Sequence, residues 1–287
     1  MKKTLFILCF LGILIRANSQ NSNEIKLIVR GDDIGSSHAA NLACIESYKN
    51  GIMKTVEIMV PCPWFPEAVK LLNENPGLDV GIHLTLTSEW DNVKWRPLTC
   101  CPSLVDSSGY FFPKVWPDKN YPGKSILENK WKIEEIEKEI RAQIELAKRK
   151  IPHVTHVSAH MAWTMASHEL EALAKKIAKE YQLNYETEGL DIQGTGYAGP
   201  TNSSEEKIRS FINMLDKFKP GNSYLFVDHP GLNNDEMKAV YHIGYENVSV
   251  DRQGVTDLFT NPSVKEALKK KGILVYSYKE MFEKKKK

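Results

Sequence analysis

The sequence lacks an excess of charge of either sign, since 38 lysine and arginine residues stand against 36 aspartate and glutamate residues in a chain of 287. This balance provides no electrostatic basis for binding nucleic acid or an anionic membrane surface. The sequence also has no glycine-rich phosphate-binding loop, which argues against phosphoryl chemistry. No internal repeat or low-complexity linker divides the chain, so we expect a single domain.

Long apolar runs are scarce as well. Residues 5–15 form an apolar run of about 11 residues, which is too short to span a membrane. The run follows Lys2 and Lys3 and precedes small residues at positions 17–19, so residues 1–19 are predicted to be a secretory signal peptide. Its removal takes away three of the 38 basic residues and leaves 35 against 36 acidic ones. We therefore expect an exported protein, periplasmic or secreted, without an integral membrane segment.

Cysteine is another residue that occurs rarely. Four of the five cysteines follow the predicted signal, namely Cys44, Cys62, Cys100 and Cys101. Their positions match neither a zinc finger nor a Cys-x-x-Cys redox motif. An exported protein can form disulfides, but this spacing assigns no pairing.

The rest of the chain alternates short apolar runs with amphipathic stretches. We expect strands over residues 25–29, 55–60, 79–84, 154–157, 224–227 and 273–276, and helices over residues 39–49, 67–73, 132–150, 168–181, 205–218 and 262–270. Repeated strand–helix units over residues 24–287 favour an α/β fold of the TIM-like (β/α) barrel type. A doubly wound open sheet is the alternative.

Ionisable residues stand where four of the expected strands end, and in a barrel these ends form the active site. Asp33, His83 and His160 would supply one oxygen and two nitrogen ligands to a divalent ion, with positions left for water and substrate. His156 lies four residues before His160, and in an extended segment these two side chains are roughly 13 Å apart. Only one of them can share the ion, and His160, further past the strand end, is the better candidate.

Asp32 and Asp33 form an acid pair after the first strand. Adjacent residues on an extended backbone face opposite sides, so we expect one carboxylate to hold a metal and the other to handle a proton. The alternative is a turn in which one aspartate caps the helix that begins at Ala39.

Residues 88–131 fit no regular element and contain eight aromatic residues and five prolines. Loops of this length in a compact domain are usually lids or binding loops. Since aromatic rings stack on sugar rings, Trp90 and Trp95 are candidates for a substrate-binding wall. The alternative is that the aromatic residues pack the loop onto the barrel.

Several motifs occur together in one order: Asp-Asp-Ile-Gly at 32–35, Gly-Ile-His-Leu-Thr-Leu-Thr at 81–87, Thr-His-Val-x-x-His at 155–160, and His-Pro-Gly at 229–231. This combination resembles the YdjC-like carbohydrate deacetylase family, which includes chitooligosaccharide deacetylases. The resemblance covers essentially the whole chain after the signal. It implies a distorted, seven-stranded (β/α) barrel related to polysaccharide deacetylases. It also implies a divalent ion, magnesium or zinc, on Asp33, His83 and His160.

The mechanism that we expect is metal-assisted hydrolysis of an acetyl amide on a small carbohydrate. Asp32 is the expected general base, and His229 is the expected general acid for the leaving amine. Arg30, Arg252 and Asp257 are expected to orient Asp32 or the sugar, although structural ion pairs are an equal alternative. A homodimer is compatible with the sequence.

The chain departs from the family pattern at three places. Arg30-Gly31 stands where family members usually carry Asn-Ala, and Ser158 stands where an Asp is common. Residues 161–163 replace a richer histidine cluster. Carboxylates behind metal-binding histidines orient them, so Ser158 is expected to weaken metal binding or to shift the preferred ion.

Two other functions remain open. One is a different metal-dependent hydrolase on the same barrel, although the expected opposition of Asp32 and Asp33 argues against glycoside cleavage. The other is a catalytically decayed carbohydrate-binding protein. Retention of the acids and histidines argues against decay.

Overall fold

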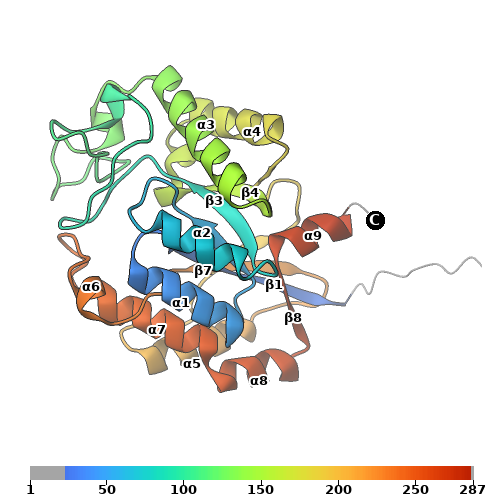
Figure 1. Ribbon diagram of the computed structural model, residues 1–287. Helices are drawn as coiled ribbons and strands as arrows, with labels where there is room; N and C mark the ends of the chain where they lie inside the picture. The colour runs from blue at the N-terminus through green and yellow to red at the C-terminus, as the bar shows by residue number, and fades with distance from the viewer. Residues whose placement is uncertain (1–22, 286–287) are drawn as a thin grey trace, which may run out of the picture.

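Strand β1 (Ile25–Ile34) is the longest described strand and lies in the middle of a parallel sheet (Figure 1). The computed structural model describes residues 23–285, so the predicted signal peptide lies outside the described residues. Within residues 23–285, no helix is both long and apolar enough to cross a membrane.

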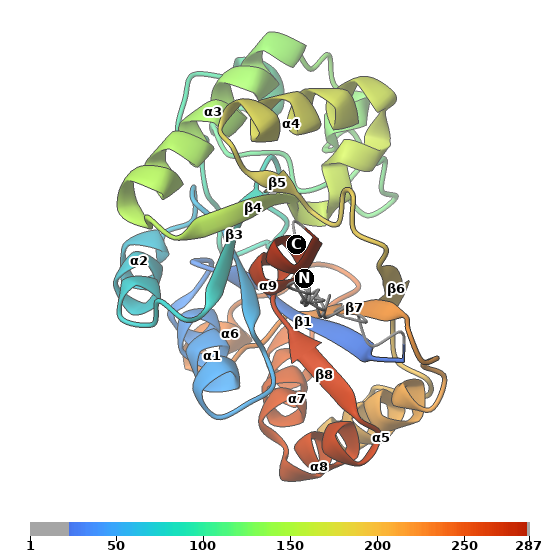
Figure 2. The same ribbon diagram turned by 90° about the vertical axis from the view of Figure 1, so that its right-hand side faces the viewer.

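The sheet curls into an open barrel whose strands all pair in parallel (Figure 2). Neighbouring strands follow the order β5-β4-β3-β2-β1-β7-β6, and β8 pairs with the first half of β1. No ladder joins β5 to β6 among the described residues, so the barrel is open there. The TIM-like fold is thus confirmed, with seven strands on one path and an eighth beside it. The other strands are β2 (Thr55–Ile58), β3 (Asp79–Leu84), β4 (Val154–Ala159), β5 (Asn184–Tyr185), β6 (Gln193–Thr195), β7 (Ser223–Asp228) and β8 (Ile273–Tyr276).

Most helices pack on the outside of the curled sheet, whereas α9 (Tyr278–Lys285) lies across its middle, where Tyr278 packs with Ile28 and His156 (Figure 2). Apolar residues at helical spacing explain why the outer helices form: in α3, for example, Ile136, Ile140 and Ile144 are buried on one face. Ser37, and neither aspartate of the acid pair, caps α1 by accepting from the Ala40 N–H. The helices that the sequence predicted, with ends shifted by a few residues at most, are α1 (His38–Lys49), α2 (Phe65–Asn73), α3 (Ile133–Lys150), α4 (His168–Glu180), α5 (Ser204–Leu215) and α8 (Pro262–Lys270).

Three helices were not predicted: α6 (Asp235–Lys238), α7 (Val248–Thr260) and α9 (Tyr278–Lys285). Helix α7 packs between α1 and α5 and buries polar as well as apolar residues, among them Arg252 and Thr256. An interior helix with polar residues facing inward shows little amphipathic periodicity, which is why α7 escaped prediction.

The segment 88–131 has only the short 3₁₀ turns η1 (Pro102–Leu104) and η2 (Ile126–Glu128), as its composition predicts. It lies beside the start of α3 and beyond the carboxyl end of β3 (Figure 1). The buried Glu139 carboxylate of α3 anchors it by accepting from the backbone N–H groups of Leu98 and Thr99, at 3.0 and 2.9 Å. The loop is therefore tied to the barrel at the end where the site forms.

Candidate active site

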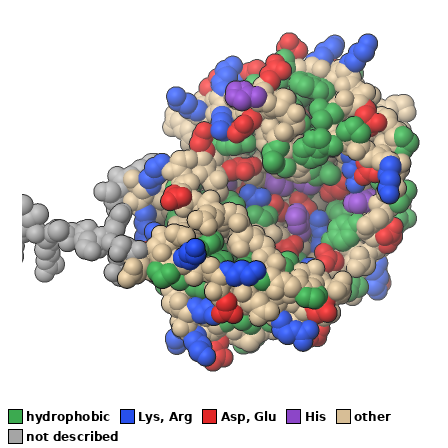
Figure 3. Space-filling model, turned by 180° about the vertical axis from the view of Figure 1, so that it is seen from behind, with side chains coloured by type: hydrophobic (Ala, Val, Ile, Leu, Met, Phe, Trp, Pro, Cys, Tyr) green, Lys and Arg blue, Asp and Glu red, His purple; other side chains and the backbone are tan. Residues whose placement is uncertain are grey.

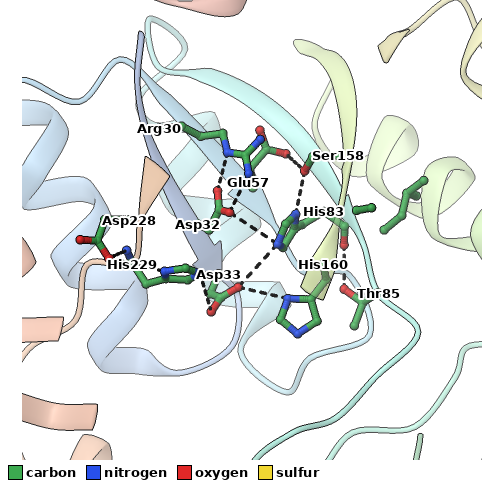
Figure 4. A network of polar contacts seen from close by, with 12 residues as sticks. Arg30, Asp32, Asp33, Glu57, His83, Thr85, Ser158, His160, Asp228 and His229 are labelled. Carbon is green, nitrogen blue, oxygen red and sulfur yellow. Dashed lines mark hydrogen bonds and ion pairs between the residues drawn. The ribbon is translucent and has the colours of Figure 1, made fainter. Parts of the chain in front are cut away.

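The three predicted metal ligands, Asp33, His83 and His160, meet at the carboxyl end of the sheet (Figure 4). Asp33 lies on β1 and His83 on β3, while His160 begins the 3₁₀ segment η3 (His160–Ala166) after β4. Asp33 Oδ1 is 3.8 Å from His83 Nε2 and 3.5 Å from His160 Nδ1, and one donor atom of each residue lies within 4.8 Å of the others. One divalent ion with open positions for water fits this set.

The surroundings of the Asp33 carboxylate keep it ionised and favour a bound cation. Its Oδ2 accepts from Arg252 Nη2 at 2.8 Å, whereas the buried Oδ1 makes no hydrogen bond among the described residues. Burial by itself raises the pKa of Asp33, but Arg252 and His229 outweigh it and hold the pKa well below its ordinary value. An ionised oxygen that is buried without a hydrogen bond is costly, and a cation between the two imidazoles would satisfy it.

The two histidines differ in their affinity for protons. Burial, assisted by His160, holds the pKa of His83 well below its ordinary value, so His83 is neutral and can act as a ligand. Burial also lowers the pKa of His160, but Glu89 and Asp33 overcome it and raise that pKa to about 10. An ion that binds this set therefore has to displace a proton from His160.

Two carboxylates that the sequence did not reveal hold the histidines from behind. Glu89 Oε2 lies 3.0 Å from His160 Nε2, and Glu57 reaches His83 through Ser158. Glu57 is an acid in the fully buried strand β2, and a charge is rarely buried without a partner. An acidic residue within an apolar strand was therefore the sequence signal that could have identified Glu57. No sequence pattern pairs Glu89 with His160.

The expectation that Asp32 and Asp33 face opposite sides is wrong. Both carboxylates point to the same cavity, with Asp32 Oδ2 at 3.7 Å and Asp33 Oδ1 at 3.8 Å from His83 Nε2. Asp33 has a φ of 74°, and the register with β2 shifts between Gly31 and Ile34. This left-handed residue breaks the alternation of side chains along the strand. The argument against glycoside cleavage, which assumed that Asp32 and Asp33 face opposite sides, therefore no longer holds.

Arg30 holds Asp32 in one orientation. Its Nη2 donates to Oδ2 at 2.9 Å, and its Nε forms an ion pair with Oδ1 at 2.8 Å. Both side chains are buried at the floor of the cavity. Arg30 is thus placed to orient the expected general base.

His229 lies on the other side of Asp33, just after β7. Its Nε2 is 4.0 Å from Asp33 Oδ2, and its Nδ1 is 3.6 Å from Oδ1 of Asp228. Tyr197 donates to the other oxygen of Asp228 at 2.6 Å and fixes that carboxylate. Burial lowers the pKa of His229, but Asp33 and Asp228 outweigh it and raise the pKa above its ordinary value. A protonated His229 is the state that a general acid needs.

Asp257 is not part of the site. It lies on α7, where its two oxygens accept from Ser204 Oγ and Gln253 Nε2 at 2.7 and 2.8 Å, and it does not line the cavity. The preceding turn of α7 instead presents Arg252, which contacts Asp33 and lies 5.2 Å from the Trp90 ring. Helical geometry explains the correction, because residues five apart do not share a face.

The candidate site forms a cavity of about 410 Å³, lined by Arg30, Asp32, Asp33, His83, Glu89, His160, His229 and Arg252. The surface in Figure 3 is hollowed, and histidine and acidic side chains gather in the hollow. The lining residues beyond those already described are Trp90, Ala159, Met161, Ala162, His242 and Tyr245.

The two candidate tryptophans of segment 88–131 are placed differently. Trp90 lines the cavity and stacks on His242 with ring centroids 5.5 Å apart. Trp95 does not line it: its Nε1 donates to the Thr87 carbonyl at 2.7 Å, and its ring packs edge-on against His160. Trp90 therefore belongs to the wall, and Trp95 to the packing that supports it.

This difference predicts separate effects for two substitutions. Trp90→Ala should raise KM for an oligosaccharide substrate and also lower the free energy of unfolding, because its ring is buried as well. Trp95→Ala should remove a buried ring and lower the free energy of unfolding by about 3–5 kcal/mol. Steady-state kinetics and denaturant unfolding test both, with the exposed Trp116→Ala as a matched control. An unchanged KM in Trp90→Ala would contradict the wall.

The fold and site define an α/β barrel with a candidate divalent-metal set at the carboxyl ends of its strands. Beside this set lie the buried carboxylate of Asp32 and the imidazole of His229, which contacts Asp228. The sequence profile of the family described as "YdjC-like protein" matches residues 26–270. The chain belongs to this family.

Individual relatives agree with this assignment. The chain is similar to a protein of Enterococcus faecalis named "Carbohydrate deacetylase", at 26% identity over 89% of this chain and 98% of that protein. It is also 36% identical to a Thermus thermophilus protein of the same name, over 55% of this chain and 51% of that protein. A crystal structure described as a putative cellobiose-phosphate cleavage protein from Enterococcus faecalis has a TM-score of 0.70 at 23% identity, over 89% and 98% of the two chains. That likeness supports the fold.

Proposed function

We propose that this protein is a metal-dependent hydrolase that removes acetyl groups from N-acetylated sugars or oligosaccharides. The observation that carries the proposal is the position of Asp33 Oδ1, which makes no hydrogen bond among the described residues and lies between His83 and His160, with Asp32 on one side and His229 on the other. Membership of the YdjC-like family and relatives named carbohydrate deacetylase support the substrate class.

Asp33, His83 and His160 would hold the ion. A bound divalent ion supplies Lewis acidity, which lowers the pKa of water and polarises a carbonyl. Asp32, fixed by Arg30, takes the proton of the attacking water as its oxygen bonds to the acetyl carbon. His229 Nε2 then donates a proton to the sugar nitrogen while the carbon–nitrogen bond breaks, and acetate and an amino sugar leave.

Other parts of the proposal come from the sequence alone. Residues 1–19 lead us to propose export to the periplasm or beyond. Magnesium and zinc are the proposed ions, and a small carbohydrate is the proposed partner. A homodimer stays a prediction.

The test is acetate release from N-acetylglucosamine oligomers. The metal-stripped protein is assayed with and without added magnesium, zinc, manganese or cobalt, beside a His83→Ala variant that lacks one ligand. We expect the wild type to regain activity with at least one metal and the variant to stay inactive. A folded wild type that releases no acetate with any metal would overturn the substrate class and favour another hydrolase or a binding protein.

A further inference from the structure

A chain of buried polar side chains runs below the cavity, from β2 and β4 to His83 (Figure 4). Glu57 Oε1 lies 2.7 Å from His156 Nε2, and Glu57 Oε2 accepts from Ser158 Oγ at 2.5 Å. Ser158 Oγ in turn lies 2.7 Å from His83 Nδ1. Glu57, His156 and Ser158 are fully buried and do not line the cavity, so substrate does not contact them.

The directions of these hydrogen bonds follow from counting protons. A carboxylate only accepts, so the single hydroxyl proton of Ser158 points to Glu57. The contact between Ser158 Oγ and His83 must then use an N–H on the Nδ1 of His83. A neutral imidazole carries one proton, so Nε2 of His83 keeps its lone pair. That lone pair faces Asp32 and Asp33.

The same counting explains why Glu57 remains a carboxylate. Thr155 Oγ1 donates to Asp79 Oδ1 at 2.6 Å, so it must accept from His156 Nδ1, which lies 2.8 Å away. His156 therefore carries protons on both nitrogens and is an imidazolium ion. Burial raises the pKa of Glu57, but His156 outweighs it and brings the pKa below its ordinary value. The ion pair of Glu57 and His156 thus sets the direction of the whole chain.

We propose that Glu57 is a positioning residue that acts through Ser158 to hold His83 in the tautomer and orientation that a metal ion requires. Ser158 by itself cannot do this, because a hydroxyl both donates and accepts and would allow either tautomer. With Glu57 behind it, the hydroxyl can only accept from His83. The inference rests on the proposed metal site and is independent of the substrate.

A pair of substitutions that exchanges the two groups tests this relay. Ser158→Ala removes the hydroxyl and Glu57→Thr removes the carboxylate, so each should weaken zinc binding by about 10- to 100-fold. The double variant Glu57→Thr with Ser158→Asp keeps the same number of side-chain heavy atoms. It places a carboxylate beside His83 and a hydroxyl beside His156, and should bind zinc within a few-fold of wild type.

Zinc affinity is measured by calorimetry without substrate, on metal-stripped protein whose folding is checked by circular dichroism. The control is Ser47→Ala, which removes another fully buried serine hydroxyl, on α1, and should not change the affinity. Heteronuclear NMR of the histidine ring nitrogens in metal-free protein supplies a second readout. We expect the Nδ1–H tautomer of His83 in the wild type and a mixture of tautomers in Ser158→Ala.

The outcomes separate this inference from the proposed function. Ser158→Ala with wild-type affinity and a single tautomer would overturn the relay, as would a double variant that binds as weakly as the single variants, while the metal site would stand. A wild type that binds no divalent ion would overturn both. Zinc affinities in the expected order, together with no acetate release, would support the relay and reject the substrate class alone.

Discussion

Asp32→Asn is expected to lower kcat for acetate release by about 10²- to 10⁴-fold, the usual contribution of a general base. Asparagine keeps the shape of the side chain but cannot take a proton from water. Asp32 lies outside the set of ligands, so zinc affinity should change little. Parallel measurements of kcat and zinc affinity in the same preparation test both parts of this prediction.

The substitution also leaves Arg30 buried without its carboxylate, and breaking such a pair costs about 3–5 kcal/mol. A control separates this effect from catalysis. Arg30→Gln combined with Asp32→Asn removes both charges, so it should recover thermal stability but not the rate. Recovery of kcat in the double variant, or full activity in Asp32→Asn, would show that Asp32 is not the base.

His229→Gln should lower kcat for the N-acetyl substrate by about 10²- to 10⁴-fold and leave hydrolysis of an activated aryl acetate much less affected. An amine leaves only after it is protonated, whereas an aryloxide leaves without a proton. The ratio of the two rates, measured in wild type and variant, reports whether His229 protonates the leaving group. Equal losses on both substrates would contradict that role.

Asp228→Asn provides a matched variant that keeps the histidine. Asp228 is one of the groups that raise the pKa of His229, so its loss should lower that pKa. The acid form of His229 is lost as the pH rises through its folded pKa. The alkaline limb of kcat/KM should therefore move to lower pH in Asp228→Asn, with little change on the acid side.

The fold was largely predictable because local hydrophobic periodicity indicates the alternation of strands and helices. The strands near residues 79–84 and 273–276 and the amphipathic α3 and α8 have the lengths that the pattern indicates. Strands β5 and β6, of two and three residues, are too short to leave a pattern. Helix α7 was missed for a different reason, since its polar residues face the interior and weaken the amphipathic pattern.

The candidate metal set was predictable for a topological reason. Parallel strands bring their carboxyl ends to one edge, so ionisable residues at the ends of β1, β3 and β4 had to meet there. The orientation of the acid pair was not predictable, because it depends on the positive φ of Asp33. The supports Glu57 and Glu89 were missed because each reaches its histidine from a separate part of the chain.

The sequence by itself determined the barrel class, the family and the three positions of the candidate metal set, because strand periodicity and motif order are local properties of the chain. Only the tertiary structure decided that Asp32 and Asp33 share one cavity, that Trp90 and not Trp95 lines it, and that Asp257 lies outside it. It also decided that a carboxylate on β2 supports His83 through Ser158. Such contacts depend on backbone angles and on the packing of distant segments, to within about one ångström, and no local pattern encodes them.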